Sequence, residues 1–298
     1  MFELSDGLFS LDICGSEIYV LDKIHGSLGF SWKAAPGFTI TLDGYIVKVK
    51  DRVVLSGLFD KGDNTLPPAF IARFPADAET AQFFANAVNT TNTGLDIVVD
   101  YNKKWGANSL KILLAGNIQH LNIDAIHVPS TLNDTKLHQK TFYSDREEAF
   151  LKASAPNSKF SLGADFTHHT IGIGLHFTAY GKILLLGFGD GASPSGDNPN
   201  YSGINPQVPT DADPNIYVPE QFNFKGKITT DIYISYRLRK QVRLFVGADN
   251  LFNTHPDLGV NPLAKGWFGD NESGGPWDSV QMGFNGLRLF AKLAFDFK

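Results

Sequence analysis

The chain is poor in cysteine, in charge and in long apolar runs. Cys14 is its single cysteine, which excludes a disulfide within the chain and a zinc site built on cysteines. Charged residues make up 19% of the sequence and the net charge is −5, which argues against a nucleic-acid-binding protein. No run of about eighteen apolar residues occurs, so we expect no transmembrane helix. We also expect no secretory signal, because the N-terminal segment lacks a cationic start followed by an apolar core.

Signals for catalysis and for metal binding are also missing. No serine stands in a nucleophile-elbow motif, and no cysteine–histidine pair has a supporting context. His168 and His169 are adjacent, and adjacent strand residues point to opposite faces, so they make a poor chelating pair. Asp190, Asp197 and Asn198 do not have the spacing of an EF-hand. We therefore predict no enzyme, no catalytic or metal-ligating residue, and no cofactor.

Phenylalanine and glycine are abundant instead, with 24 and 29 copies in 298 residues. The length allows one large β domain or two ordinary domains. Many aromatics, many glycines and few charges suit a β-barrel with a lipid-facing band and turn-rich loops. Residues 1–24 are weakly patterned and stay unassigned, so the predicted barrel segment covers residues 25–298.

A strict two-residue alternation is the clearest pattern, and it dominates the last quarter of the chain. The strand predicted at 227–238 and the closing strand at 287–297 each place apolar residues on one face and polar residues mainly on the other. Strands of about ten such residues are the length that a tilted transmembrane β-strand needs. The two apolar faces are formed by Ile228, Thr230, Ile232, Ile234, Tyr236 and Leu238, and by Leu287, Leu289, Ala291, Leu293, Phe295 and Phe297.

Further strands are predicted upstream, beginning at Ser27. Residues 38–57 form one of them, and its apolar parity changes beyond Gly44, which predicts a β-bulge there. Residues 78–101 contain helix-favouring alanines, but the β-branched end of this stretch favours one long strand entering from a loop. Residues 108–123 pair with it, and 159–187 form the next hairpin. About ten strands result.

Connections of two kinds alternate along the chain. Short turns are predicted at 34–37, 102–108, 168–170 and 239–241, and long loops at 57–80, 123–143, 188–224 and 253–286. Loops longer than about fifteen residues are uncommon inside compact soluble domains. Transmembrane barrels have short turns on one side and longer loops on the other. The alternation therefore predicts an antiparallel transmembrane β-barrel.

Three segments resemble one family, the TonB-dependent outer-membrane receptors, in the C-terminal part of their barrel. Residues 83–101 resemble a stretch that leads into a mid-barrel strand, and residues 40–57 a strand with an Ile/Val-Lys-Asp-Arg-hydrophobic sequence. The aromatics Phe295 and Phe297 resemble the terminal signal that the outer-membrane assembly machinery reads, with Lys298 as a departure. A third motif resembles the end of the penultimate strand and consists of Gly247, Ala248, Asp249, Asn250, Leu251, Phe252 and Asn253.

The resemblance implies a partial barrel, about ten strands of a 22-stranded whole. Complete receptors of this family carry a plug inside the barrel and import iron chelates, cobalamin, sugars or peptides with energy from TonB. We expect this chain to lack the plug and the TonB box and to be a fragment of such a receptor in the cell outer membrane. Its implied partners are the lipid bilayer, the assembly machinery and, in the complete receptor, TonB and a small nutrient ligand.

Aromatics in the long loops are the candidate ligand contacts, because such loops form the outer surface of a receptor. The alternative is loop packing or an interfacial aromatic girdle. Two other functions stay open at this stage: a small self-closed outer-membrane pore or adhesin, and a secreted soluble carbohydrate-binding β protein. The candidate contact residues are Tyr201, Tyr217, Phe222, Trp267 and Trp277.

Overall fold

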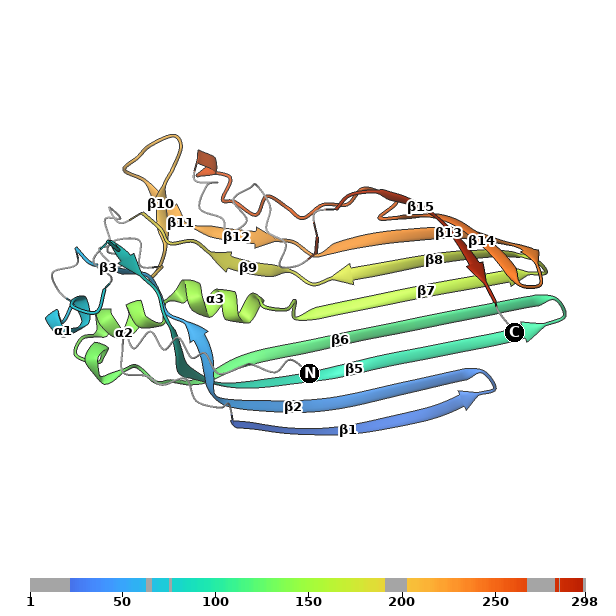
Figure 1. Ribbon diagram of the computed structural model, residues 1–298, viewed down its shortest axis with the longest axis horizontal. Helices are drawn as coiled ribbons and strands as arrows, with labels where there is room; N and C mark the ends of the chain where they lie inside the picture. Colours follow the sequence, from blue (N-terminus) through green and yellow to red (C-terminus); the bar gives the residue numbers. More distant parts are fainter. Residues whose placement is uncertain are drawn as a thin grey trace.

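One large antiparallel sheet dominates the computed structural model, which describes residues 22–62, 66–74, 77–190, 203–266, 282–283 and 285–296. Nine strands of these residues follow the order β1-β2-β5-β6-β7-β8-β13-β14-β15 (Figure 1). No further strand pairs with β1 or β15 in the described ranges, so the sheet is open. The strands are β1 Asp22–Ala35, β2 Phe38–Leu55, β5 Phe84–Trp105, β6 Asn108–Ile126, β7 Ser158–His168, β8 Ile171–Tyr180, β13 Lys227–Arg239, β14 Val242–Asp249 and β15 Arg288–Phe295.

Short turns and long connections lie at opposite ends of this sheet, as the sequence predicts. Two residues each join β1 to β2, β5 to β6, β7 to β8 and β13 to β14 at one end. At the other end the long connections fold into helices and short strands (Figure 1). The nine strands are close to the predicted ten, and the fold class of antiparallel barrel-type sheet is confirmed.

We call the described parts of these long connections the loop assembly: residues 56–62, 66–74, 77–83, 127–157, 181–190, 203–226 and 250–266. The sequence analysis missed its helices, because it treats 57–80 and 123–143 as loops and assigns no structure to 144–158. Its elements are β3 Phe59–Asp60, α1 Pro68–Ile71, β4 Thr80–Ala81, η1 Ser130–Leu132, α2 Lys136–Phe142, α3 Asp145–Ala153, β9 Ile183–Leu186, β10 Gln207–Pro209, β11 Tyr217–Pro219 and β12 Gln221–Phe224.

Both longer helices of the loop assembly begin at a hydroxyl N-cap. The Thr135 hydroxyl accepts a hydrogen bond from the His138 amide, and the Ser144 hydroxyl accepts one from the Glu147 amide. The sequence Ser-x-x-Glu at 144–147 is the capping-box pattern, so the start of α3 is readable from the sequence. Asp145, Glu147 and Glu148 in the first turn also favour a helix N-terminus.

Two hydrophobic clusters hold the loop assembly together. The first joins the end of β2 and the start of β5 to α1 and α2, and its rings contact one another in edge-on, stacked or tilted pairs. The second packs Phe150 and Ala153 of α3 against the antiparallel pair β9 and β12. Buried side chains of the first cluster include Phe59, Phe70, Phe83, Leu132 and Phe142, and those of the second include Ile183, Leu185, Phe222 and Phe224.

The predicted bulge near Gly44 is wrong. Pairing of β2 with both β1 and β5 is continuous through Gly44, and the register shifts instead lie between Val49 and Val53. Ile46 continues the exposed apolar face, while Tyr45 belongs to the opposite face. The sequence analysis misassigned Tyr45 because its ring is apolar while its hydroxyl is polar. The actual bulge has Asp51 in the left-handed region, at φ 51°.

The predicted strand through 171–187 is also divided. β8 ends at Tyr180, and after two residues β9 pairs with β12 rather than with the main sheet. The Gly181 amide bonds back to the Ser158 carbonyl, and a Cβ at Gly181 would lie 2.7 Å from the Ser158 hydroxyl. This close approach turns the chain out of the sheet and into the loop assembly.

Candidate functional site

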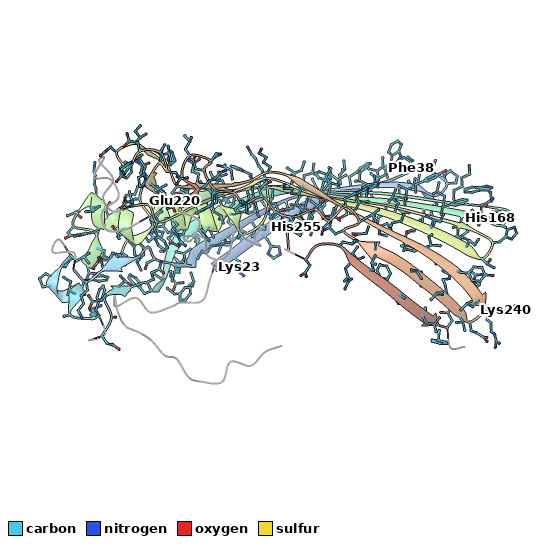
Figure 2. All side chains as sticks on the ribbon, turned by 90° about the horizontal axis from the view of Figure 1, so that it is seen from above. Lys23, Phe38, His168, Glu220, Lys240 and His255 are labelled. Atoms are coloured by element: carbon cyan, nitrogen blue, oxygen red, sulfur yellow. The ribbon has the colours of Figure 1, made fainter. Side chains whose placement is uncertain are left out.

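The outer face of the sheet is an uncovered apolar band. Figure 2 shows the sheet as one curved layer, and Leu28 and Leu289 are 85% and 75% exposed. Register places Phe160, Ile232 and Leu289 on this same face, as the sequence predicts for Ile232 and Leu289. The band runs over Phe38–Ile46 in β2, Leu110–Ile118 in β6 and Ile228–Leu238 in β13. Each span matches the roughly nine to eleven residues with which a tilted strand crosses a bilayer.

Aromatic side chains gather on this face near the short turns. Two ring pairs connect strands there, Phe38 of β2 with Tyr101 of the neighbouring β5, and Trp105 of β5 with Phe166 of β7 across β6, each with centroids 6.2 Å apart. Rings at this level form the interfacial girdle that is typical of transmembrane barrels. Its members are Trp32, Phe38, Tyr101, Trp105, Phe166, Tyr236 and Phe295.

The inner face is polar and hydrogen-bonded across strands. Asn117 of β6 donates from Nδ2 to the Tyr45 hydroxyl at 3.1 Å and to Asp96 Oδ1 at 2.8 Å. On the same face, Asn92 Nδ2 donates to Gln119 Oε1 at 2.9 Å. Such side-chain networks fix strand register on a face that no apolar core specifies.

A second inner-face network joins β7, β8 and β13. The Tyr233 hydroxyl donates to Asp165 Oδ1 at 2.7 Å, and His176 Nε2 lies 3.0 Å from the same oxygen. Tyr233 passes over Gly174, where a Cβ would be 2.0 Å from the ring. The sequence analysis missed these residues, although alternation already assigns His176, Asp165 and Tyr233 to the polar face.

Within the loop assembly, α3 carries a buried ion pair. Arg146 Nη1 lies 2.7 Å from Glu147 Oε1, and both side chains are under 10% exposed. The Arg146 guanidinium also lies 4.4 Å from the Phe150 ring centre and 3.9 Å from that of Phe188. Burial raises the pKa of the Glu147 carboxyl, against the lowering effect of Arg146. This cluster ties α3 to the connection that follows β9, and the sequence analysis missed it.

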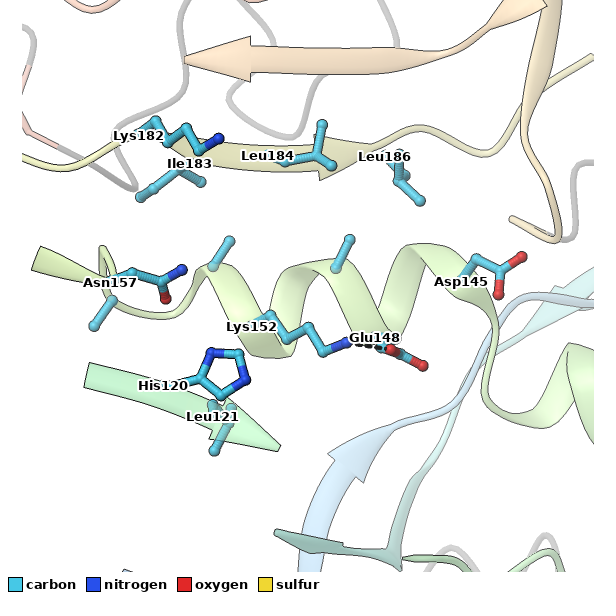
Figure 3. A pocket seen from close by; sticks show the side chains of 13 residues that line it. His120, Leu121, Asp145, Glu148, Lys152, Asn157, Lys182, Ile183, Leu184 and Leu186 are labelled. Atoms are coloured by element: carbon cyan, nitrogen blue, oxygen red, sulfur yellow. Dashed lines mark hydrogen bonds and ion pairs between the residues drawn. The ribbon is translucent and has the colours of Figure 1, made fainter. Parts of the chain in front are cut away.

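A cavity of about 370 Å³ lies between α3, β9 and β6 (Figure 3). Asp145, Glu148 and Lys152 of α3 line it, as does Lys182 from the segment before β9. In Figure 3 Glu148 and Lys152 lie on the side of α3 near His120 of β6, and Lys182 lies on the β9 side. Glu148 and Lys152 form an ion pair. Burial raises the pKa of Asp145, but hydrogen bonds from Lys140 and the Asn205 amide outweigh it and hold that pKa below its usual value. The cavity falls in the size range of small-ligand pockets.

The predicted ligand contacts have different positions. Tyr217 lies in β11, and its hydroxyl donates to Asp190 Oδ2 at 3.1 Å. Partial burial and this bond raise the pKa of the Tyr217 hydroxyl. Phe222 is 4% exposed within the second hydrophobic cluster, which leaves little ring surface for a ligand. Tyr201, Trp267 and Trp277 lie outside the described residues.

The motif Gly247–Asn253 forms a structural joint at the end of β14. Asn250 and Asn253 adopt the left-handed conformation, with φ of 50° and 53°. Asn250 Oδ1 accepts from the Thr254 amide at 2.8 Å, and Asn253 Oδ1 accepts from the Leu287 amide at 2.9 Å. Asn tolerates this conformation and satisfies the backbone groups that it frees. The motif thus connects β14 to the loop that follows it and to the start of β15.

Phe295, one of the two predicted assembly-signal residues, lies on the outer face at the end of β15. It is exposed there, and Phe297 lies outside the described residues. The signal itself stays a prediction. Within the ranges that the structure describes, no three His, Cys, Asp or Glu side chains come together to hold a metal ion. No helix among the described residues is long and apolar enough to cross a membrane.

A single-layer antiparallel sheet with an apolar outer face, a polar inner face and connections sorted by length defines a transmembrane β-barrel wall. The profile of the family described as "TonB dependent receptor-like, beta-barrel" matches residues 26–251. The chain therefore belongs to this family, which confirms the resemblance, and it is an outer-membrane protein. No curated protein sequence matches the chain.

Solved structures show the same fold. The outer membrane transporter YddB from Escherichia coli superposes with a TM-score of 0.53 at 10% identity, over 94% of this chain and 33% of YddB. FpvAI in its complex with pyocin S2 gives a TM-score of 0.50 at 10% identity, over 93% of this chain and 28% of the other. The chain thus spans about a third or less of the length of these proteins.

Proposed function

We propose that the chain forms part of the wall and outer loops of a receptor that captures a nutrient and imports it across the outer membrane. The family supports import as the activity, and YddB is itself an outer membrane transporter. The observation that carries the proposal is the loop assembly, because a pore wall by itself requires no folded structure at its long-loop end. Iron chelates, sugars, peptides and cobalamin are the proposed substrate classes.

We further propose that the isolated chain is not an active transporter. The open sheet leaves the outer edges of β1 and β15 unpaired among the described residues. Unpaired backbone groups in hydrocarbon cost several kcal/mol each, so a closed barrel requires further strands. Passage of a substrate through vesicles that contain this chain alone would refute this part of the proposal.

Removal of the β10–β11 tip tests capture. Pro209 pairs with Tyr217, so replacing residues 210–216 with Asn-Gly closes a two-residue hairpin and leaves both strands in register. In a receptor that contains this chain, we expect lost uptake of the cognate nutrient with normal assembly of the barrel. The matched control replaces Lys240-Gln241, the two-residue turn between β13 and β14 at the opposite end of the sheet, with Asn-Gly. The length of this turn does not change, and uptake should be unaffected.

Uptake is measured with radiolabelled iron chelates and cobalamin, and by growth on single sugars or peptides, in cells that lack the native gene. Barrel assembly is checked by heat-modifiable migration on gels. Normal growth of the tip-replaced strain on the cognate nutrient would contradict the assignment of capture to this hairpin. Tyr217→Ala, which removes the half-buried aromatic of β11, then tests the proposed ligand contact separately.

A further inference from the structure

Helix α3 takes a position in the barrel wall at the long-loop end of the sheet. β6 continues to Ile126, but β7 pairs with it only as far as Ile118. Beyond this point α3 lies between β6 and β9, as Figure 3 shows. A helix within a wall has one side toward the outside of the barrel and the other toward its interior.

The side of α3 that carries Leu151 faces the barrel interior. Leu151 packs against the first hydrophobic cluster, and Ile123 of β6 packs against the same cluster. Ile123 shares the inner face of β6 with Asn117 and Gln119, because even steps along one strand return to the same face. The opposite side of α3 lines the larger cavity together with His120, which belongs to the outer face of β6.

A second cavity, of about 280 Å³, lies on the interior side of α3, and we call it the inner cavity. At 3.6 residues per turn, the α3 residues that line it lie across the helix from Asp145, Glu148 and Lys152 of the larger cavity. Gln82 and the end of β2 form its facing wall. It is lined from α3 by Arg146, Glu147, Phe150 and Leu151, and from β2 by residues that include Val54 and Leu55.

Two oxygen atoms of the inner cavity have no hydrogen-bond donor among the described residues. Glu147 is 7% exposed, and its Oε1 accepts from Arg146 Nη1 at 2.7 Å, but its Oε2 accepts from no described group. Gln82 Nε2 donates to the Ser56 carbonyl at 2.9 Å, which leaves Gln82 Oε1 without a donor in the same part of the chain. A deeply buried carboxylate is destabilising unless its oxygens accept hydrogen bonds. A ligand that donates hydrogen bonds would satisfy both oxygens.

The charges in the inner cavity are balanced, which favours a neutral ligand. Arg146 binds Glu147, and its guanidinium lies against the Phe150 and Phe188 rings, 4.4 Å and 3.9 Å from their centres. The acceptor oxygens of Glu147 and Gln82 are therefore what the cavity offers a ligand, and they repel an anionic group. An ammonium group would lose its hydration and gain no uncompensated carboxylate. Hydroxyl groups meet both conditions.

The rest of the inner cavity is apolar. Val54, Leu55 and Leu151 contribute aliphatic side chains, and Phe150 contributes an aromatic ring. A sugar ring carries hydroxyl donors around its edge and C–H groups on its faces, so it matches a cavity with two acceptors and apolar walls. The volume is near the lower end of ligand pockets, which begin at about 300 Å³. It suits one sugar ring and is too small to enclose cobalamin or a complete iron chelate.

We propose that the inner cavity binds a neutral sugar, and that hydroxyls of one ring donate to Glu147 Oε2 and Gln82 Oε1. The inference rests on the proposed function and deepens it, because it selects sugars from the proposed substrate classes. The cavity lies next to the long-loop end on the interior side of the wall, where a captured ligand enters the barrel.

Saturation-transfer NMR on the detergent-purified full chain tests binding, with glucose, galactose, mannose and maltose as probes. Citrate and spermidine are the anionic and cationic comparisons, and the detergent, lauryldimethylamine oxide, has no sugar headgroup. We expect saturation transfer to the ring protons of at least one sugar and none to citrate or spermidine. Transfer to citrate or spermidine but to no sugar would overturn the proposal.

Glu147→Gln keeps an oxygen for Arg146 and replaces the second acceptor with an NH₂ donor. We expect the affinity for the bound sugar to fall about tenfold or more. Glu79→Gln is the matched control, because it removes an exposed carboxylate of the loop assembly outside the inner cavity, and it should bind like the unaltered chain. Leu55→Phe fills the cavity and should abolish binding, which decides the matter if Glu147→Gln fails to fold. Equal affinities of both cavity variants and the unaltered chain would refute the site. A loss in Glu148→Gln but not in Glu147→Gln would place the sugar in the larger cavity and refute it as well.

Uptake by a receptor that contains this chain separates the inner cavity from the proposed function. Glu147→Gln should reduce uptake of the sugar that the purified chain binds. A receptor that binds this sugar through Glu147 and imports no nutrient would refute import and leave the inner cavity assigned. Unchanged sugar uptake in both Glu147→Gln and Leu55→Phe would refute the inner cavity and leave import intact.

Discussion

Tyr45 and Gly94 face each other directly across β2 and β5, and the tyrosine ring occupies the space that a side chain at Gly94 would need. A Cβ on Gly94 would lie 2.2 Å from the Tyr45 hydroxyl oxygen. The same hydroxyl accepts from Asn117 one strand further on. The glycine thus allows a large ring to lie along the inner face and to connect three strands.

Gly94→Ala should therefore destabilise the sheet by about 1–3 kcal/mol, because the Tyr45 ring must move and leave Asn117. Gly44→Ala is the matched control. Gly44 lies in β2, next to the strand of Gly94, and no atom lies within 4 Å of the position that its Cβ would take. We expect the control to be neutral or slightly stabilising. Urea titration of the detergent-purified protein measures both, and equal stabilities would refute the packing argument.

Two adjacent phenylalanines give a second comparison. Phe83 is 7% exposed and its ring lies about 6 Å from those of Phe59, Phe70 and Phe142, whereas Phe84 is 61% exposed. Phe83→Ala should destabilise the loop assembly by about 3–5 kcal/mol through the cavity that it leaves. Phe84→Ala should have little effect.

Limited proteolysis and hydrogen exchange of residues 66–74 and 136–142 report on the loop assembly. Faster cleavage and exchange there in Phe83→Ala, with the main sheet still protected, is the expected result. Equal protection in both variants would show that the first hydrophobic cluster does not hold these helices.

The anchor between β13 and the last long loop should depend on pH. Burial by itself raises the pKa of Asp257, but hydrogen bonds from Lys227 Nζ at 2.6 Å and the Lys225 amide at 2.9 Å hold that pKa below its usual value. A lowered folded-state pKa contributes stability that is complete above the ordinary carboxyl pKa and is lost as the pH falls through the folded one.

We therefore expect the protection of residues 254–260 against hydrogen exchange, corrected for the intrinsic pH dependence of the exchange rate, to fall as the pH drops below about 4. Asp257→Asn should show the faster exchange already at neutral pH and should lose this dependence on acid. Asp213→Asn serves as a control, because Asp213 Oδ1 accepts its hydrogen bonds from Asn215, within the tip between β10 and β11 and not at the anchor. An acid response of the same size in Asp257→Asn would assign it to another group.

The sequence determined the wall of this protein. Alternation alone predicted that the apolar residues of Ile228–Leu238 and of the closing strand lie on one face. Connection lengths alone predicted that short turns lie at one end of the sheet and long loops at the other. Both predictions were possible because strand periodicity and connection length are local properties. The local pattern gave a wrong prediction at Tyr45, whose ring is apolar and whose hydroxyl is polar. It also missed the short helices in 136–153. The Ser144–Glu147 capping pattern was present and would have indicated α3.

Tertiary structure alone decided what lies together. No local pattern brings Arg146 to Phe188 or Tyr233 to Asp165, because each pair is separated by tens of residues and meets only through register and loop packing. Register is a property of paired strands, and burial depends on every neighbouring element. The sequence therefore specified which solvent each face meets, and the fold specified which side chains share a site.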